Sequence, residues 1–507
     1  MPIAVGIDIG NRNITVAVVR NKGIDIVVND VSNRQTPTFV SFGEKERGIG
    51  EAGFSLYLRN IRNTITDIKR LIGRQYDDQS LQNELSQLSF KTVKLDDGFV
   101  GVSAFVNGEQ QTFRIEQILA MLLIKVKEFT EEYCKDKMYE CVISCPGYFT
   151  ENQRRSILNA AEIAGIKCLR LMNEHAATGV AYGLYKTDLS EETVRPVCII
   201  DVGHSQTSCS VINFTKSKMK VISVEYNPNL GGRNYDDAVA QEVRKDIISK
   251  WKVDPMTVPR MWNRILAGIE KSVKRVISSG SPKAILNLET LYEERDYRKE
   301  FTREEFEKMT ASMNELVIDV MKKAIEKSGV ALENIHSIEI TGSGTRLSSL
   351  QDAISKTFGR QLSKTINCEE SIARGCSIAC AQLTPYFRVR DYIVEDIPPH
   401  EVTMGFKSDK REVQPMKFIG KDTAYPITRV VRMKDIKSLH VDCNYRLDEG
   451  RLGGVSDRGI TLDVVEMPKA KTETTELKLR IQMNNSGVLE MVDCNLCEEV
   501  EEEFEVK

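Results

Sequence analysis

The sequence has no long apolar segment and no excess of charge of either sign. None of its apolar runs approaches the length needed to cross a bilayer, and Met1-Pro2-Ile3 leads directly into a strand pattern without a charged leader. The formal net charge is only −3 over 507 residues. Neither a nucleic acid nor a membrane surface is therefore indicated as a partner. We expect a cytoplasmic protein, with the nucleus left open as a further location.

Histidine is scarce, and the cysteines do not form a framework. The five histidines are scattered, so no metal cluster is predicted from them. The twelve cysteines fall within strand and helix patterns, which favours buried reduced thiols over a disulfide scaffold. Cys494 and Cys497 have the spacing of a zinc or redox pair. Because no second pair lies near them in the sequence, we do not expect a site there.

The length and the composition predict a globular protein with more than one domain. A chain of 507 residues is too long for a single core, and its 41% apolar and 28% charged residues are close to the average of soluble proteins. Strand and helix patterns alternate up to about Thr384, which predicts an α/β architecture, and short alternating segments with prolines then predict a β domain. The predicted divisions are residues 1–384, a linker at 385–396, a β domain at 397–497 and an acidic tail at 498–507.

One pattern occurs twice in the α/β part. An apolar run that begins at residue 197 ends in Asp201 and turns through Gly203 into a second apolar run. The chain begins in the same way, with Asp8 and Gly10 in the equivalent places. Each copy is typical of a buried hairpin.

The turn of such a hairpin can bind phosphate. Glycine has no side chain to keep a ligand away, so successive backbone N–H groups can point at an anion. The preceding carboxylate can hold a hydrated cation, and Mg²⁺ suits this role because it usually keeps several waters. One copy alone would be an ordinary turn, but two copies favour a polyphosphate site. We therefore expect Asp8 and Asp201 to act on Mg²⁺ through water.

Other candidates lie at predicted strand ends and turns. Pro146 and Glu174 follow strands, where α/β proteins bind ligands. Lys69 lies in a short helix predicted over Asn63–Gly73, and it suits either a terminal phosphate or the solvent. Further candidates are the Gly-Gly turn before Arg233, the predicted helix Met261–Ser278 with its charged face, and the Gly-rich turn Gly342–Arg346, whose arginine could stack on a base.

Together these residues resemble the seventy-kilodalton heat-shock chaperone family over nearly the whole chain. The resemblance implies a two-lobed, actin-like ATPase domain followed by a small β-sandwich domain, with ATP and Mg²⁺ as cofactors. It places a proline switch at Pro146 and Arg154, and catalytic roles at Lys69, Glu174 and Asp201. The implied nucleotide-binding residues are Gly10, Asn11, Arg12, Asn13, Lys69, Gly203, His204, Ser205, Gly231, Gly232, Arg233, Glu270, Lys274, Gly342, Ser343 and Arg346.

The departures from the family pattern carry information as well. Ordinary members have two threonines where this chain has Asn11 and Arg12, and a Gly-Gly-Gly-Thr-Phe-Asp run where it has a segment beginning at His204. Loss of hydroxyls that position water should reduce hydrolysis more than binding. The basic pair Lys274-Arg275 fits the family only after a shift of one residue relative to Glu270.

These motifs look like the large, Sse-type branch of the family. In that branch ATP is mainly a structural ligand, and the protein is an exchange factor for an ordinary seventy-kilodalton chaperone and a holdase for unfolded polypeptides. The linker Leu383–Asp396 is charged, unlike the leucine-rich linker of ordinary members. Within these 507 residues we expect no C-terminal helical bundle.

Three functions remain open from the sequence. The first is an ATP-bound exchange factor with weak ATPase activity at most. The second is a peptide-binding chaperone that hydrolyses ATP with Lys69, Glu174 and Asp201. The third is a small-molecule kinase on the same fold, against which the β-rich end and the absence of a recognisable sugar-pocket motif weigh.

Overall fold

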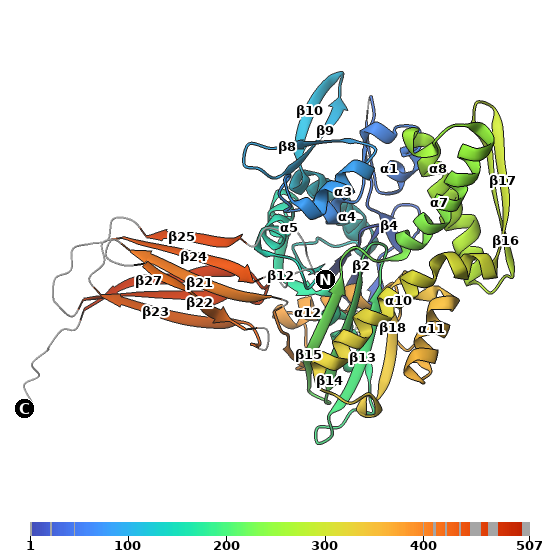
Figure 1. Cartoon of the computed structure of the whole chain (residues 1–507). Helices are drawn as coiled ribbons and strands as arrows, with labels where there is room; N and C mark the ends of the chain where they lie inside the picture. Colours follow the sequence, from blue (N-terminus) through green and yellow to red (C-terminus); the bar gives the residue numbers. More distant parts are fainter. Residues whose placement is uncertain are drawn as a thin grey trace, which may run out of the picture.

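The computed structural model describes residues 3–20, 23–44, 46–398, 400–408, 412–420, 423–434, 438–446, 458–464 and 475–498. Its architecture is mixed α/β, as the sequence predicts. The described helices all lie in one larger body, and the strands that follow residue 400 extend from its side (Figure 1).

The first lobe is built on a mixed sheet in the order β12-β11-β1-β2-β3, with β4 also paired to β2. The central strand β1 is antiparallel to β2 and parallel to β11, and it is buried almost throughout. The strands are β1 (Ala4–Ile9), β2 (Asn13–Arg20), β3 (Gly23–Ile26), β4 (Gln35–Pro37), β11 (Glu140–Cys145) and β12 (Lys167–Asn173).

The second lobe repeats this plan in the order β19-β18-β13-β14-β15-β20. Its central strand β13 is antiparallel to β14 and parallel to β18, just as β1 is to β2 and β11. The repeated hairpin predicted from the sequence is therefore confirmed. The strands are β13 (Arg195–Val202), β14 (Thr207–Phe214), β15 (Lys218–Asn227), β18 (Ser337–Thr341), β19 (Leu362–Ser363) and β20 (Ile393–Glu395).

Two helices join the lobes, α6 (Glu174–Tyr185) and α12 (Ser371–Leu383). They approach so closely that a Cβ on Gly375 would lie 1.9 Å from the carbonyl oxygen of Ala177. On its other side α12 packs on β1, where a Cβ on Gly6 would lie 2.1 Å from the backbone nitrogen of Ser377. Glycine at these two positions lets the sheets and the helices form one continuous core.

Helix caps follow local sequence rules. Helix α5 (Glu151–Ile163) begins with the predicted capping box of Thr150 and Gln153, and α10 (Arg303–Ser328) begins with that of Thr302 and Glu305. The remaining helices are α1 (Glu51–Leu56), α2 (Ile68–Leu71), α3 (Gln79–Gln87), α4 (Ile115–Cys134), α7 (Gly232–Trp251), α8 (Pro259–Ile269), α9 (Arg275–Ser278) and α11 (Ser348–Phe358). Short 3₁₀ turns span Ile61–Asn63, Pro255–Thr257, Leu332–Asn334 and Ser343–Arg346.

Smaller sheets complete the two lobes. They are β5 (Val40–Phe42) with β6 (Arg47–Ile49) and β7 (Thr64–Ile65); β8 (Lys91–Lys94) with β9 (Val100–Val106) and β10 (Glu109–Arg114); and the hairpin of β16 (Lys283–Tyr292) with β17 (Arg295–Thr302). The single helix predicted over Asn63–Gly73 is wrong. Strand β7 takes its first residues because Val40 and Ser41 of β5 pair with Ile65 and Thr64, and only α2 is helical.

The C-terminal part consists of two antiparallel sheets, of four and three strands, which share one apolar core. We call it the β domain. Its strands are β21 (Glu401–Ser408), β22 (Glu412–Ile419), β23 (Ile427–Lys434), β24 (Leu439–Arg446), β25 (Arg458–Val464), β26 (Glu476–Met483) and β27 (Leu489–Cys497). Cys494 and Cys497 both lie on β27. Apart from Glu498, the predicted acidic tail lies outside the described residues.

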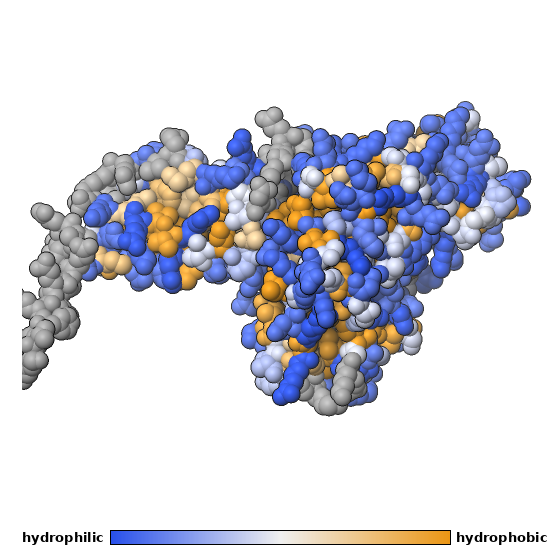
Figure 2. Space-filling view, turned by 90° about the horizontal axis from the view of Figure 1, so that it is seen from below, coloured by the Kyte–Doolittle hydropathy of each residue, from blue (hydrophilic) through white to orange (hydrophobic). Residues whose placement is uncertain are grey.

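The surface mixes hydrophilic and apolar residues on both parts of the molecule, as the view from below shows (Figure 2). Among the described helices, none combines the length and the apolar character required to cross a bilayer.

Candidate functional site

Two equivalent turns face each other where the lobes meet. In the first turn, the backbone N–H of Gly10 donates to the carbonyl oxygen of Asn13 at 3.0 Å. In the second, the N–H of Gly203 donates to the carbonyl oxygen of Gln206 at 2.9 Å. Both turns follow a central strand that carries an aspartate near its end, so the two lobes bring matching loops and matching carboxylates to one place.

The two aspartates, Asp8 and Asp201, have strongly raised pKa values. Burial raises the pKa of Asp8 to about 6, even though Lys69 opposes the shift and the hydroxyl of Ser144 donates to the carboxylate at 2.8 Å. Burial raises the pKa of Asp201 to about 7, and the nearby charges of Glu174 and Asp8 add to the shift. Negative charge therefore accumulates here, and a cation would relieve it.

The chemistry of these groups fits Mg²⁺ that keeps its own waters. Among the described residues, no three histidine, cysteine, aspartate or glutamate side chains converge as a set of metal ligands. Mg²⁺ usually keeps several of its waters, so Asp8 and Asp201 would hold the ion through its hydration shell. Asn11 Oδ1 is a buried acceptor for which the structure gives no hydrogen-bond partner, and it suits a donor such as a metal-bound water.

Lys69 lies at the centre of the site. Its ammonium forms an ion pair with Glu174, whose other oxygen accepts a hydrogen bond from Gln206 at 2.5 Å. Burial acts to lower the pKa of Lys69, but Glu174 and Asp8 outweigh it and raise the pKa. The lysine therefore stays charged, and Gln206 is a member of the site that the sequence analysis missed.

His204 is neutral and lies next to the first turn. The amide nitrogen of Asn11 donates to Asp67 Oδ1 at 2.8 Å and lies 3.0 Å from His204 Nδ1. A flipped amide would place its oxygen against the carboxylate, so the nitrogen is the donor and Nδ1 accepts. Burial, with help from Arg12, lowers the pKa of His204 to about 3. The proton of the neutral ring is therefore on Nε2, and the histidine acts as an uncharged donor.

The helix that carries Glu270 is interrupted by a π-helical turn. The sequence predicts one helix over Met261–Ser278, but Glu270–Lys274 is π-helical between α8 and α9. A π-turn holds one residue more than an α-helical turn. It therefore explains the one-residue shift between Glu270 and the basic pair. Lys274 faces the site, where its ammonium donates to the carbonyl oxygen of Gly232 at 3.1 Å and pairs with Asp236.

Gly231 and Gly232 support the second turn from behind. The N–H of Gly232 donates to the carbonyl oxygen of Gly203 at 2.9 Å, and the N–H of Arg233 donates to that of His204 at 2.9 Å. A Cβ on Gly231 would lie 2.6 Å from the backbone of His204. Gly231 is thus required by this close packing of backbone on backbone, whereas a Cβ on Gly232 would lie at an ordinary 3.6 Å from the carbonyl oxygen of Gly203.

The Gly-rich turn after β18 packs against the same turn. Gly342 has φ +79°, and a Cβ there would lie 2.2 Å from the carboxylate of Asp201. Arg346 points to Glu369 at 2.9 Å and is largely exposed. Ser343 donates to Glu369 at 3.3 Å. This segment therefore borders the site at Asp201.

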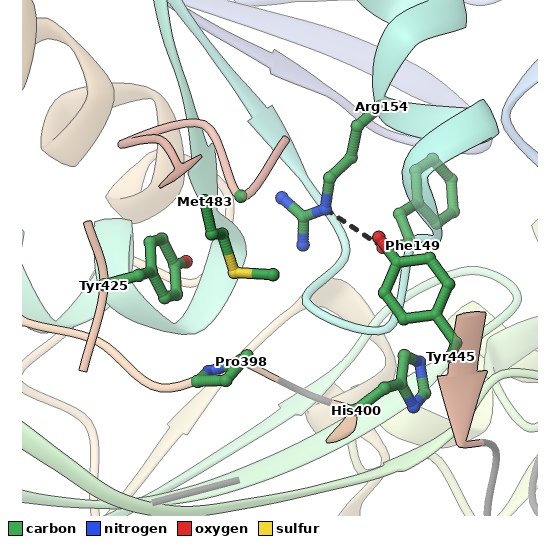
Figure 3. Close-up of a pocket in the computed structure, with 8 residues that line it drawn as sticks. Phe149, Arg154, Pro398, His400, Tyr425, Tyr445 and Met483 are labelled. Carbon is green, nitrogen blue, oxygen red and sulfur yellow. Dashed lines mark hydrogen bonds between the residues drawn. The ribbon is translucent and has the colours of Figure 1, made fainter. Parts of the chain in front are cut away.

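Arg154 connects the first lobe to the β domain. Its buried guanidinium donates to the carbonyl oxygen of Phe149 at 3.0 Å (Figure 3). It also donates to the carbonyl oxygen of Gly147 at 3.0 Å and, in the turn between β26 and β27, to that of Ser486 at 3.1 Å. The small pocket around it is lined by residues of both parts. The predicted switch arginine therefore lies at the contact between the first lobe and the β domain.

A second polar contact ties the segment after β20 to the same region. Asp396 is buried and accepts from Asn173 Nδ2 at 3.0 Å and from Tyr425 at 3.0 Å, and it lies 2.9 Å from His175 Nε2. Burial acts to raise the pKa of Asp396, but His175 outweighs it and lowers the pKa. The sequence analysis missed these residues, although Asn173 and His175 flank the predicted Glu174.

The model of the Hsp70 protein family matches residues 4–507. The chain belongs to the Hsp70 family. It is 35% identical to an Sse-type heat shock protein homolog of Lachancea kluyveri over 503 residues, which cover 99% of this chain and 72% of that protein. It is also 35% identical to the 97 kDa heat shock protein of Mesocentrotus franciscanus, in an alignment that covers 98% of this chain and 56% of that protein. It is 36% identical to heat shock 70 kDa protein 16 of Arabidopsis thaliana, where the alignment covers 97% of this chain and 65% of that protein. The chain thus spans between 56% and 72% of the length of these three relatives.

These relatives confirm the resemblance to the large branch that the motifs indicate. The Hsp70 chain described here has Asn11, Arg12 and His204 at the turns where ordinary members have hydroxyl groups and glycines, and the structure brings all three together between the lobes.

Proposed function

We propose that this Hsp70-family chain binds ATP with Mg²⁺ and acts as a nucleotide exchange factor for an ordinary seventy-kilodalton chaperone. The two lobes form the actin-like nucleotide domain, and the β domain is a β-sandwich that holds unfolded polypeptides. ATP is a structural ligand in this proposal, and hydrolysis is weak at most. The whole assembly works in the cytoplasm or the nucleus.

The observation that carries the proposal is that the three parts of the molecule are joined as one closed body. Asn11 of the first turn contacts His204 of the second where the lobes meet, and Arg154 holds the turn of the β domain. Such a closed form presents a fixed surface to a partner, which an exchange factor needs in order to stabilise an open partner cleft.

The chemistry of the site favours binding over hydrolysis. Lys69 is positioned for a terminal phosphate, and Asp8 and Asp201 for hydrated Mg²⁺, which would supply charge neutralisation at the phosphates. Neutral His204 donates to an acceptor but cannot draw a proton from water at pH 7. Gln206 could orient water, but its amide nitrogen already donates to Glu174.

The test is release of fluorescent ADP from an ordinary seventy-kilodalton chaperone. We expect the ATP-bound chain to accelerate release at least tenfold, and the nucleotide-free chain to do so less. A lack of acceleration at saturating concentrations would overturn the exchange role.

The second candidate is a chaperone with its own hydrolytic cycle. It is favoured by the meeting of Lys69, Glu174 and Asp201 at one place. Steady-state phosphate release at the rate of an ordinary member, measured on the same preparation, would favour this candidate.

A further inference from the structure

Arg12 reaches from one lobe to the other. It lies in the turn between β1 and β2, and its guanidinium Nη2 lies 3.3 Å from Glu270 Oε2 on the π-turn of the second lobe. The side chain therefore spans the distance from the first turn to the π-turn of the second lobe. No hydroxyl or amide at this position could make the same crossing, because only a long side chain has the reach.

Two aromatic rings hold the guanidinium in place. Its carbon lies 5.0 Å from the ring centre of Phe39 and 5.5 Å from that of Phe54. Stacking on aromatic faces orients the planar group and lowers the entropy cost of a further contact. Arg12 is thus held in position by apolar faces and does not depend on Glu270 for its placement.

The ion pair between Arg12 and Glu270 is longer than the pairs that Lys69, Arg233, Lys274 and Arg346 make at the site. The two side chains are 28% and 40% exposed, and a single long contact between such groups contributes little. The other cations are more firmly engaged. Lys69 pairs with Glu174 in a buried contact, Lys274 pairs with Asp236, and Arg233 binds Glu84 with two hydrogen bonds of 2.6 and 2.8 Å.

We propose that Arg12 exchanges Glu270 for the phosphates of the bound nucleotide and makes affinity depend on their number. A guanidinium presents a fork of N–H donors that matches phosphate oxygens, and only part of that fork is used by Glu270. The nucleotide then replaces Glu270 as the partner of Arg12, so that this one of the several connections between the lobes runs through the phosphates. This inference rests on the proposed binding of an adenine nucleotide in the cleft.

The experiment compares the binding of AMP, ADP, ATP and inorganic tripolyphosphate by calorimetry. We expect Arg12→Asn to weaken the binding of ATP and of tripolyphosphate by roughly 10- to 100-fold, because charge-assisted hydrogen bonds are lost. We expect the same substitution to weaken the binding of AMP by less than about 3-fold, since AMP lacks the further phosphates that the fork binds. Arg12→Lys keeps the charge but not the fork of N–H donors, so its affinity for ATP should lie between that of the wild type and that of Arg12→Asn.

Arg20→Asn is the matched control. Arg20 lies in the same lobe, is 26% exposed, pairs with Asp25 at 2.8 Å and stacks on Tyr133 at 4.6 Å, but it does not reach the cleft. A second measurement, backbone hydrogen exchange without nucleotide, reports the lobe contact directly. Arg12→Asn should speed exchange at the N–H groups of Gly10 and Gly203, and Arg20→Asn should leave both unchanged.

The outcomes separate this inference from the proposed function. Equal losses for AMP and ATP, no loss for either, or the same losses in Arg20→Asn would overturn the role of Arg12. A wild-type chain that binds tripolyphosphate but no adenine nucleotide would refute the proposed function and leave the phosphate role of Arg12 standing. A chain that binds none of the four ligands would refute both.

Discussion

Glu84 offers the sharpest test of how the two lobes are held together. It lies on α3 of the first lobe, and its carboxylate, on a side chain only 7% exposed, accepts two hydrogen bonds from Arg233 of the second lobe. Arg70 Nε lies 2.8 Å from the same carboxylate. Burial acts to raise the pKa of Glu84, but Arg233 and Arg70 outweigh it and hold the pKa below its usual range.

Glu84→Gln removes the negative charge that both guanidinium groups share. Loss of one partner from a buried ion pair costs about 3–5 kcal/mol, because the other charge stays buried without compensation. Taking about 3 kcal/mol, the population in which the lobes separate should rise roughly 100-fold. The local opening matters more than global unfolding here, since a chain with several domains does not unfold in two states.

Hydrogen exchange of peptides from α3 and from the start of α7 measures this opening. Glu300→Gln is the control, because Glu300 pairs with Lys283 at 2.7 Å on the surface, where such pairs contribute about 0–1 kcal/mol. An acceleration in Glu84→Gln of less than about 5-fold, equivalent to roughly 1 kcal/mol, would refute the view that this contact holds the lobes together.

Three further predictions follow from the site. Gly487 has φ +68°, and a Cβ there would lie 3.2 Å from the Arg154 guanidinium, so Gly487→Ala should weaken docking of the β domain by about 1–3 kcal/mol and speed proteolysis of residues 385–396. Gly108 also has a positive φ but nothing near its Cβ position, so Gly108→Ala should not affect this cleavage. Between about pH 4 and 7, Asp8 and Asp201 bind more protons in the folded chain than in the unfolded chain. The thermal-unfolding midpoint, measured in the presence of a chelator, should therefore fall as pH rises through this window, and Asp201→Asn should make the midpoint depend less on pH. Deletion of Ser272 should change the unfolding midpoint little because the π-turn holds one extra residue, whereas deletion of Leu266 in α8 should lower the midpoint strongly. Equal effects of the two deletions would contradict the view that the π-turn accommodates an inserted residue.

Features set by neighbours in the sequence can be predicted. The capping boxes of α5 and α10 depend on residues three apart, and the twin hairpins depend on apolar runs that end in an aspartate and a glycine. The hairpin between β26 and β27, with its turn at Asn484–Gly487, is predictable for the same reason. In each case the determining contacts lie within a few residues of one another.

Features that depend on partners far away in the sequence cannot be predicted in this way. The sequence predicts Ile393–Glu395 as part of a linker, but this segment pairs in parallel with Lys218–Lys220 and extends the sheet of the second lobe. Strand β7 likewise forms because β5 offers an edge. A short segment with little periodicity of its own takes the structure that a neighbouring strand provides, and that neighbour is not visible in the local pattern.

The candidate site divides in the same manner. The residues that motifs identify, such as Asp8, Lys69 and Asp201, lie together where the strands end. Asp396 gives no signal because two of its partners, a histidine and an asparagine, lie more than 200 positions away, and the third, Tyr425, lies 29 positions away. The π-turn gives an indirect signal, as a misfit of one residue.

That misfit shows how the site and the lobes depend on each other. A one-residue insertion in a regular helix would rotate every later side chain by about 100° and take Lys274 away from Gly232. The π-turn absorbs the insertion, so that Glu270 still meets Arg12 from the opposite lobe while Lys274 still meets the second turn. Such turns recur at functional sites because the extra residue is costly in an undisturbed helix. Its placement between the two residues that face the cleft argues that contacts on both sides of it are used.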